Sequence, residues 1–293
     1  MMRQITRNAY AKINLALDVT GRREDGYHLV RMIMQEIGLY DTLTFRAIPD
    51  GKRQIRLRVG ESDLSAGEDN LICRAVRVMQ KTLELQDSFD IDLVKRIPIA
   101  AGLAGGSTDA AAAFLALRDL YAPEMSDEEL QDLALPLGAD IPYCIAGGTR
   151  LSEGIGEKLT PLPSLPAWPL ILVKPSVGVN TGQVYRALDA LEGYDHPDVE
   201  GMIRAIERKD LKTTAALCDN VLELVTGPMV PRIGEVEAFF LKEGALTARM
   251  SGSGPSVFAL YENKEKAADA LEAFFRSPVS EGCFGALTEL YTR

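Results

Sequence analysis

The sequence predicts an α+β fold of two domains, on three observations. The chain has 293 residues, more than a single hydrophobic core usually organises. Strand-like and helix-like stretches come in mixed blocks rather than in strict alternation. The segment 159–169 carries four prolines in eleven positions, a density that neither a helix nor a central strand tolerates. We therefore predict an N-terminal domain over residues 1–160 and a second domain over residues 161–293.

The N-terminal part is predicted to open with a strand at residues 9–19. Apolar residues such as Ile13 and Leu17 alternate there with Lys12 and Asn14, which is typical of a strand with one buried face. A charged turn with Asp-Gly at its tip follows. Further strands are expected at residues 42–48, 53–59 and 89–97, and helices at 68–85, 107–121 and 126–138, the last opening on a capping-box spacing.

The C-terminal part is predicted to be richer in helices. Residues 170–175 form an apolar strand, and two more strands flank the glycine-rich turn SGSGP, residues 251–255. These flanking strands are expected at 245–250 and 256–261, a last strand at 285–291, and helices near 181–192, 198–207, 210–225, 231–243 and 263–275.

Composition narrows the class of protein. The formal net charge of −10 argues against a broad nucleic-acid or anionic-membrane footprint. We find no signal peptide and no run of eighteen apolar residues, so a cytoplasmic location without a membrane is expected. The four cysteines and two histidines are widely separated, which predicts free thiols rather than disulfides or structural zinc. The oligomeric state is not readable.

The stretch PIAAGLAGGSTDAAAAF, residues 98–114, carries the main chemical signal. Three glycines precede an alanine-rich helix, and the free backbone N–H groups at a helix start are donors suited to phosphate oxygens. Ser107 and Thr108 add hydroxyls for phosphate or metal. The stretch is not a Walker P-loop, and a plain strand-to-helix connection is the alternative. The second glycine turn, in MSGSGPSVFAL at 250–260, also reads as an ordinary β-turn.

Lys12 and Asp140 are candidate catalytic residues. Asp140 precedes Ile-Pro in a nearly apolar context, so it also fits the cap of a helix whose first turn contains proline. Lys12 lies among uncharged neighbours, although a lone lysine on a strand usually faces solvent. If the two side chains meet, the lysine would keep the carboxylate ionised, and the carboxylate could orient a substrate hydroxyl and take its proton. Phosphoryl transfer needs little more than positioning and charge stabilisation.

These stretches resemble the GHMP kinases, the family of galactokinase, homoserine kinase, mevalonate kinase and phosphomevalonate kinase. Residues 98–114 and 250–260 are similar to its two glycine motifs. The opening AYAKINLALDVTGRREDGYH and the stretch LGADIPYCIAGGTRLSEGIGE at 137–157 are similar to a narrower branch. That branch phosphorylates the 2-hydroxyl of 4-diphosphocytidyl-2-C-methyl-D-erythritol in the non-mevalonate (MEP) isoprenoid pathway. The resemblance spans nearly the whole chain and implies a mixed β/α N-terminal domain, a smaller α/β sandwich, and an active site in the cleft between them.

The resemblance also implies roles for individual residues. Asp140 would be the catalytic base, assisted by Lys12. ATP, accompanied by Mg²⁺, would be bound by Asn70, Lys95, Pro98, Ile99, Ala100, Ala101, Gly102, Leu103, Ala104, Gly105, Gly106, Ser107 and Thr108. The cytidyl substrate would be bound by Asn14, Tyr27, His28, Asp140, Thr181 and Tyr185, with aromatic rings stacking on the base. The Mg²⁺ ligands are left unassigned, because no second acidic residue matches the metal-binding glutamate of mevalonate kinase.

Two residues depart from the family pattern, and two other functions stay open. Ala104 stands where glycine is most common and Thr108 where serine is usual, which leaves the affinity for ATP uncertain. A GHMP kinase for homoserine or mevalonate is one alternative, although an aromatic clamp has no use for a substrate without a base. A non-catalytic sensor is the other, although it would be expected to have lost Lys12 or Asp140.

Overall fold

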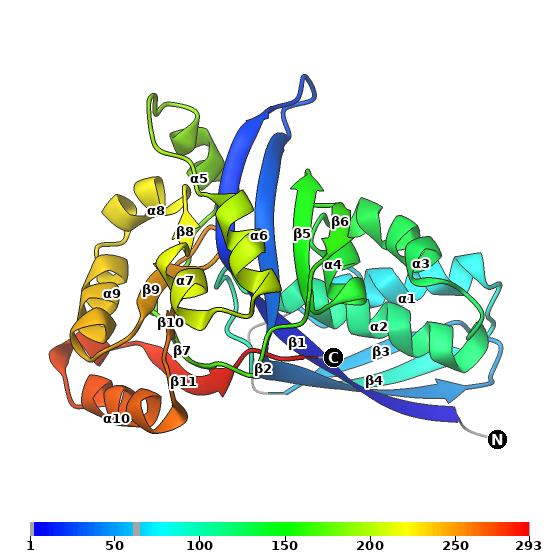
Figure 1. Ribbon diagram of the computed structural model, residues 1–293. Helices are drawn as coiled ribbons and strands as arrows, with labels where there is room; N and C mark the ends of the chain where they lie inside the picture. Colours follow the sequence, from blue (N-terminus) through cyan, green and yellow to red (C-terminus); the bar gives the residue numbers. More distant parts are fainter. Residues whose placement is uncertain (1–2, 61–64, 293) are drawn as a thin grey trace. The chain divides into compact units, whose positions relative to one another are not determined.

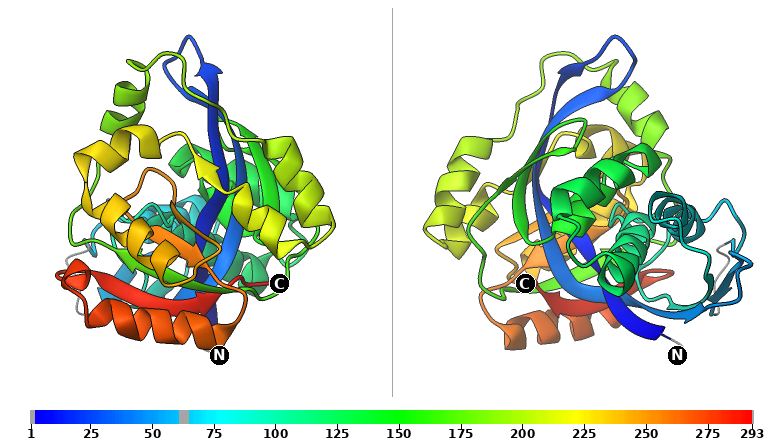
Figure 2. Two further views of the ribbon diagram at one scale, coloured as in Figure 1. Left: turned by 60° about the vertical axis from the view of Figure 1, so that its left-hand side comes forward. Right: turned by 90° about the vertical axis from the view of Figure 1, so that its right-hand side faces the viewer.

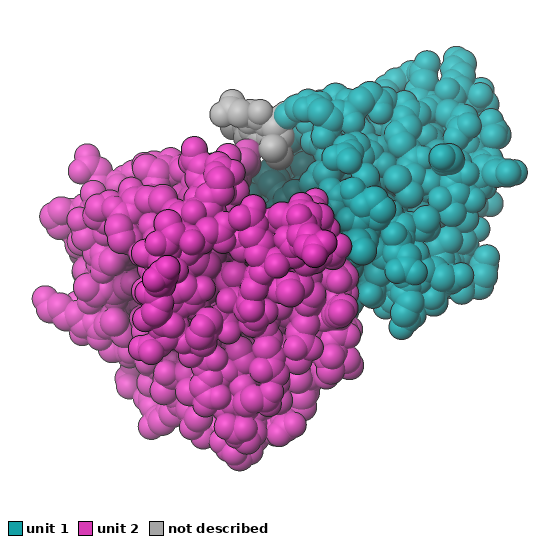
Figure 3. Space-filling view, turned by 90° about the horizontal axis from the view of Figure 1, so that it is seen from above, with its two compact units in different colours: residues 1–11, 39–97, 104–146 teal, residues 12–38, 98–103, 147–293 magenta. Residues whose placement is uncertain are grey.

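The computed structural model describes residues 3–60 and 65–292, which divide into two compact units (Figure 3). Unit 1 comprises residues 1–11, 39–97 and 104–146, and unit 2 comprises residues 12–38, 98–103 and 147–293. The long strands β1 (Arg3–Arg22) and β2 (His28–Ile48) contribute to both units. Segments of the two units therefore alternate along the chain. The predicted domain boundary at residue 160 stays a prediction.

Unit 1 is a sheet with helices on one face (Figure 1). β4 (Ser88–Val94) pairs antiparallel with β2 and parallel with β3 (Ile55–Val59). Phe89 and Ile91 of β4 are fully buried, as expected for the face that packs against helices. The helices are α1 (Leu71–Thr82), α2 (Gly105–Tyr121), α3 (Asp127–Ala134), the short 3₁₀ helix η1 (Leu135–Leu137) and α4 (Ile141–Ala146).

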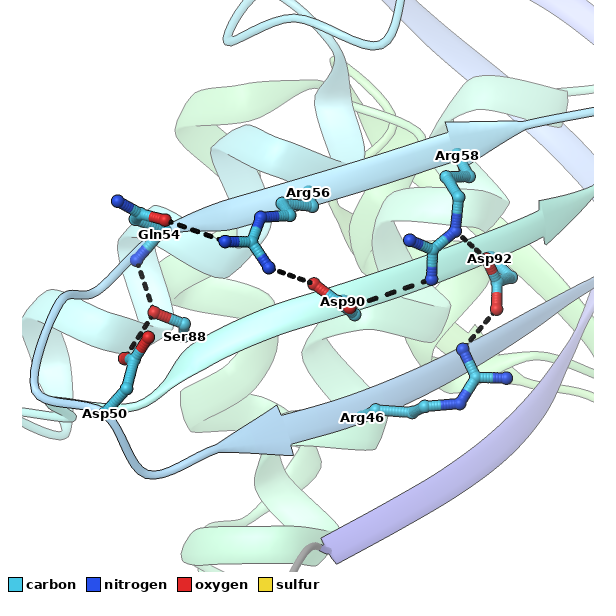
Figure 4. A network of polar contacts seen from close by, with 8 residues as sticks. All are labelled: Arg46, Asp50, Gln54, Arg56, Arg58, Ser88, Asp90 and Asp92. Carbon is cyan, nitrogen blue, oxygen red and sulfur yellow. Dashed lines mark hydrogen bonds and ion pairs between the residues drawn. The ribbon is translucent and has the colours of Figure 1, made fainter.

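The other face of this sheet carries a ladder of charged side chains (Figure 4). Asp92 accepts hydrogen bonds from Arg46 and from Arg58, the latter at 2.6 Å. Asp90 lies between Arg56 and Arg58 at 3.5 and 3.8 Å. Such pairs on a solvated sheet face contribute little to stability. They identify this face as a solvent-exposed surface of unit 1.

Unit 2 contains an antiparallel sheet in the order β11-β7-β10-β9. The helices α9 and α10 pack against this sheet (Figure 2), and Phe240 of α9 meets Phe274 of α10 with ring centroids 5.0 Å apart. The elements are β7 (Pro169–Lys174), β9 (Thr247–Met250), β10 (Val257–Leu260), β11 (Phe284–Glu289), α9 (Arg232–Lys242), α10 (Lys264–Phe275) and the 3₁₀ helix η2 (Pro278–Ser280).

The rest of unit 2 surrounds its parts of β1 and β2. β5 (Thr149–Gly154) pairs antiparallel with β2 and with β6 (Lys158–Pro161), and β8 (Asp219–Asn220) pairs parallel with β1. The remaining helices are α5 (Thr181–Leu188), α6 (Val199–Glu207), α7 (Leu211–Ala216) and α8 (Glu223–Met229). Across residues 3–60 and 65–292, no helix has the length and apolar content that crossing a membrane requires.

The predicted single helix over 210–225 is wrong. The structure divides this stretch into α7, the short strand β8 and α8, because Asp219 and Asn220 pair with Ala16 and Leu17 of β1. The Asn220 side chain also donates to the carbonyls of Met250 and Gly252, at 2.9 and 2.8 Å. β5, β6 and the first half of β2 were likewise not predicted from the sequence. Most residues of 30–37 are buried, so no alternation marks that half as a strand.

Candidate active site

The two glycine loops recognised in the sequence meet in unit 2. A Cβ at Gly102 would lie 2.3 Å from the carbonyl oxygen of Ser251, and a Cβ at Gly252 would lie 2.9 Å from the carbonyl oxygen of Gly102. The Ser251 hydroxyl donates to that Gly102 oxygen at 3.2 Å. Both glycines have positive φ, +72° and +59°. The loops are thus packed backbone against backbone, which only residues without a side chain permit.

Lys12 and Asn14 of β1 lie beside these loops. The Lys12 ammonium is nearly buried and donates to Asn14 Oδ1 at 2.7 Å and to the Gly102 carbonyl at 3.2 Å. The backbone N–H of Asn14 donates to the Ser251 hydroxyl at 3.3 Å. The interpretation of Lys12 as a solvent-facing strand lysine is therefore wrong. The structure places a nearly buried cation beside the first glycine loop, a charge suited to an anionic substrate.

The start of α2 in unit 1 is open to an anion. Within the described residues, no acceptor is found for the backbone amides of residues 104–107, and the Thr108 amide is the first to bond inside the helix, to Ala104. Ala104, the N-cap, adopts a left-handed conformation with φ +56° and gives no side-chain cap. Four amides left free at one helix end supply both donors and the positive end of the helix dipole.

Three predicted ATP residues are engaged in holding unit 1 together. The Thr108 hydroxyl donates to the Tyr10 carbonyl at 2.8 Å. Asn70 caps α1 by accepting from the Ile72 amide at 2.9 Å. Lys95 donates to Asp41 at 2.5 Å and to Asp109 at 2.7 Å, with its side chain 8% exposed. Direct contact of these residues with ATP stays a prediction.

The Lys95 cluster is a buried group of one cation and two carboxylates. Asp41 also accepts from the amides of Arg96 and Ile97, which fixes the chain entering the glycine loop. Within the described residues, the second carboxylate oxygen of Asp109 has no hydrogen-bond partner. Burial raises the pKa of Asp109 against the opposing charge of Lys95. Neither aspartate was predicted from the sequence as part of this cluster: Asp41 lies more than fifty positions before the loop, and no local pattern pairs Asp109 with Lys95.

A second cluster in unit 2 involves the residues expected to grip a nucleobase. The rings of His28 and Tyr185 stack with centroids 4.7 Å apart at 27°. Tyr185 lies on α5, whose start is capped by Asn180 through the amide of Gln183. Tyr27, by contrast, is 59% exposed. Two of the three predicted residues are thus brought together as aromatic neighbours, and the third offers a free ring surface.

Asp189, the C-cap residue directly after α5, was not predicted from the sequence. Its carboxylate contacts His28 Nε2 at 2.7 Å and Arg22 at 3.2 Å. A signal existed in its position four residues after Tyr185, because residues at that spacing share one side of a helix. Thr181, at the start of α5, shares a hydrogen bond of 2.8 Å with Ser253 in the second glycine loop. The helix α5 therefore links the residues that are expected to bind the base to that loop.

Asp140 directly precedes α4 in unit 1. Its carbonyl accepts the first helical hydrogen bond, from Cys144 at 3.1 Å, so the predicted cap position is correct. The side chain is half-buried. Lys12 belongs to unit 2 and Asp140 to unit 1, so their predicted meeting stays a prediction. Across residues 3–60 and 65–292, no three His, Cys, Asp or Glu side chains gather to hold a metal ion.

Comparisons with known proteins decide the family. The GHMP kinases N terminal domain matches residues 70–148, and the GHMP kinases C terminal domain matches residues 202–280. A 4-diphosphocytidyl-2-C-methyl-D-erythritol kinase of Lachnoclostridium phytofermentans is 46% identical over 280 residues, which cover 96% of each chain. This chain belongs to the GHMP kinase family.

Two further comparisons agree with this assignment to the GHMP kinases. The 4-diphosphocytidyl-2-C-methyl-D-erythritol kinase of Clostridium novyi is 47% identical over 266 residues, 91% of this chain and 94% of the relative. A crystal structure of a 4-(cytidine 5'-diphospho)-2C-methyl-D-erythritol kinase matches with a TM-score of 0.83 at 33% identity, over 99% of this chain and 100% of that one. The predicted family, two-domain α+β fold and kinase class are confirmed, whereas the roles of individual GHMP kinase residues stay predictions.

Proposed function

We propose that this GHMP kinase transfers the γ-phosphoryl group of ATP to the 2-hydroxyl of 4-diphosphocytidyl-2-C-methyl-D-erythritol, in the non-mevalonate route to isoprenoid precursors. The observation that carries the proposal is the stacked pair of His28 and Tyr185, because an aromatic pair is suited to a substrate that contains a base. The near-full-length likeness to kinases named for this substrate supports the same choice.

The proposed ATP site uses the free amides at the start of α2 and the glycine loop before it. Preorganised backbone donors stabilise charge on a transferring phosphoryl group without reorganising. Ser107 is half-buried at this helix end, where its hydroxyl could reach a phosphate oxygen or the metal. Mg²⁺ would neutralise the developing phosphate charge. Since Mg²⁺ usually keeps several waters and takes few protein ligands beside the phosphates, it would arrive with ATP.

Asp140 is proposed as the base that accepts the proton of the substrate hydroxyl. Lys12 would keep that carboxylate ionised and hold the substrate, with Asn14 as a hydrogen-bonding neighbour. In the structure the Lys12 ammonium has Asn14 and the Gly102 carbonyl as partners, so a carboxylate or phosphate could still approach its third proton. The nearly buried ammonium is already oriented, which lowers the entropy cost of binding.

The homoserine or mevalonate alternative predicts different substrates. A kinase for either would gain nothing from an aromatic pair, whereas the cytidyl substrate presents a flat base. Purified protein with ATP and Mg²⁺ should release ADP with the cytidyl substrate and not with homoserine or mevalonate. ADP release with homoserine or mevalonate alone would reject the proposed substrate and keep the kinase class.

Two variants test the assigned roles. Asp140→Asn should lower turnover by about 10²–10⁴, the usual contribution of a positioned acid–base group, while the affinity for ATP stays near normal. Tyr27→Ala should raise the KM for the cytidyl substrate far more than the KM for ATP. Near-full activity of Asp140→Asn, or equal losses for both substrates in Tyr27→Ala, would reject the corresponding role.

The other expectations about binding partners and location follow from the kinase class and the composition of the chain alone. The substrates are small molecules, and the net charge of −10 gives no reason to expect nucleic acid or an anionic membrane as a partner. A cytoplasmic location is proposed because the substrate and ATP belong to central metabolism.

A further inference from the structure

We propose that Asp189 is the positioning residue that makes the site select cytosine over uracil, by holding the His28 ring with its proton on Nε2. The inference rests on the proposed function, since it concerns the base of the same substrate. It assigns to Asp189 a role that acts through His28 rather than by direct contact with the substrate.

The Asp189 carboxylate is held at both oxygens. Oδ1 lies 2.7 Å from His28 Nε2, and Oδ2 accepts from Arg22 at 3.2 Å. Arg22 in turn donates through Nε to the carbonyl of Gly26 at 3.3 Å, within the turn that carries His28. A carboxylate has only lone pairs to offer, so the ring nitrogen that faces it must carry the proton. Among the described residues, Nε2 of His28 is therefore assigned as a donor.

The orientation of the His28 ring is fixed by a second contact from the same helix. Tyr185 stacks on the imidazole at 4.7 Å, four residues before Asp189 on α5. Stacking holds the plane of the ring, and the hydrogen bond to Asp189 holds its rotation within that plane. The His28 side chain keeps 12% of its surface exposed. A ring held in both respects presents one defined edge to a ligand.

The tautomer of His28 determines whether the free edge of its ring offers a donor or an acceptor to a ligand. A neutral imidazole has one N–H donor and one acceptor, so a proton on Nε2 leaves Nδ1 with a lone pair. Within the described part of the chain, no hydrogen bond is found at His28 Nδ1. Cytosine presents an amino donor at its 4-position, which can donate to Nδ1, whereas uracil presents a carbonyl oxygen there. Two facing acceptors leave both unpaired, which should disfavour uracil about tenfold to a hundredfold.

The first test reads the tautomer without any substrate. The chain has two histidines, so protein labelled with ¹⁵N-histidine gives two ring spin systems. His196 contacts Asp18 through Nδ1 at 2.7 Å, so it should carry its proton on Nδ1. It therefore serves as an internal reference for the opposite tautomer. We expect protonated Nε2 for His28 in the wild type, a mixture in Asp189→Ala, and retention in Asp189→Asn, which keeps an acceptor oxygen. Protonated Nδ1 at neutral His28 in the wild type would overturn the inference.

The second test measures selectivity. Binding of CMP and UMP, and the kcat/KM ratio of the cytidyl substrate to its uridyl analogue, should favour cytosine in the wild type. The preference should fall about tenfold or more in Asp189→Ala, with the KM for ATP unchanged, and persist in Arg22→Ala, which leaves the contact to His28. An unchanged preference in Asp189→Ala would refute the role of Asp189. Preferred binding of CMP without turnover of either substrate would support this inference while rejecting the proposed function.

Discussion

Replacing Gly102 by alanine should separate the two glycine loops of unit 2. An added Cβ would lie 2.3 Å from the Ser251 carbonyl oxygen and 3.1 Å from backbone atoms of Gly254. These neighbours are main-chain atoms, so no flexible side chain can swing aside. The Gly102 carbonyl also accepts from Lys12 and from the Ser251 hydroxyl. Displacing the loop would therefore disturb the lysine that we propose as a catalytic residue.

The expected loss of stability in Gly102→Ala has two parts that can be measured separately. Gly102 has φ +72°, and an L-residue in the left-handed region costs roughly 1–2 kcal/mol. Forcing extra volume into a packed site typically costs about 1–3 kcal/mol more. Gly193 provides a matched control, because its φ is +68° and nothing lies within 4 Å of its Cβ position. Gly193→Ala should lose only the backbone part, roughly 1–2 kcal/mol.

Urea unfolding of the wild type and both variants measures the difference. We expect Gly102→Ala to be less stable than Gly193→Ala by about 1–3 kcal/mol, with similar m-values, and to bind ATP more weakly. Equal losses in the two alanine variants would show that the loops are not packed as the structure has them. A loss of ATP affinity in Gly193→Ala alone would be equally incompatible with this packing of the loops.

Three further substitutions should each change the stability of the protein, or its dependence on pH, in a defined direction. Ala104→Gly should raise stability by about 1 kcal/mol, because φ +56° strains alanine; a lower unfolding midpoint would contradict this. Lys95→Met should cost about 3–5 kcal/mol by leaving the buried carboxylate of Asp41 without its cation, and a thermal shift near zero would refute it. Burial, with Glu223 nearby, raises the pKa of Glu237. The native state therefore keeps this proton to higher pH than the unfolded chain, and stability should fall as pH rises above about 4.3. Glu237→Gln should flatten that slope in urea midpoints taken from pH 5 to 8, and an unchanged slope would exclude Glu237 as its source.

Local signals in the sequence predicted most of the helices and strands. The capping box at Ser126 and Glu129 is present, and the helix after the glycine loop runs to Tyr121 as expected. These features depend on residues within a few positions of each other, so a single sequence contains their cause. The family resemblance added the kinase class and the overall fold, which no local pattern could supply.

The misses share a physical origin in contacts between residues distant along the chain. The helix predicted over 210–225 satisfied local spacing, yet pairing of Asn220 with β1 and with the second glycine loop interrupts it. Asp41 and Asp109 are unremarkable in the sequence, and their importance follows from sharing the ammonium of Lys95. Asp189 likewise gains its role from His28, 161 positions earlier. Spacing along one chain carries no information about such partners.

For the two glycine loops, the functional interpretation as a phosphate-binding segment and the structural interpretation as turns are compatible. SGSGP was open to explanation as an ordinary turn, and the first loop as a plain connection. In the structure the backbone of Ser251 and Gly254 occupies the space that a side chain on Gly102 would need, and Gly102 occupies the space that a side chain on Gly252 would need, so part of the glycine requirement is packing between the two loops. Within the part of the chain that the structure describes, the backbone amides of residues 104–107 have no acceptor, because the packing of the loops uses backbone atoms of the preceding segment. The glycines therefore allow the two loops to pack closely and rigidly. The capacity to bind an anion belongs instead to the amides at the start of α2, which follows the first loop directly.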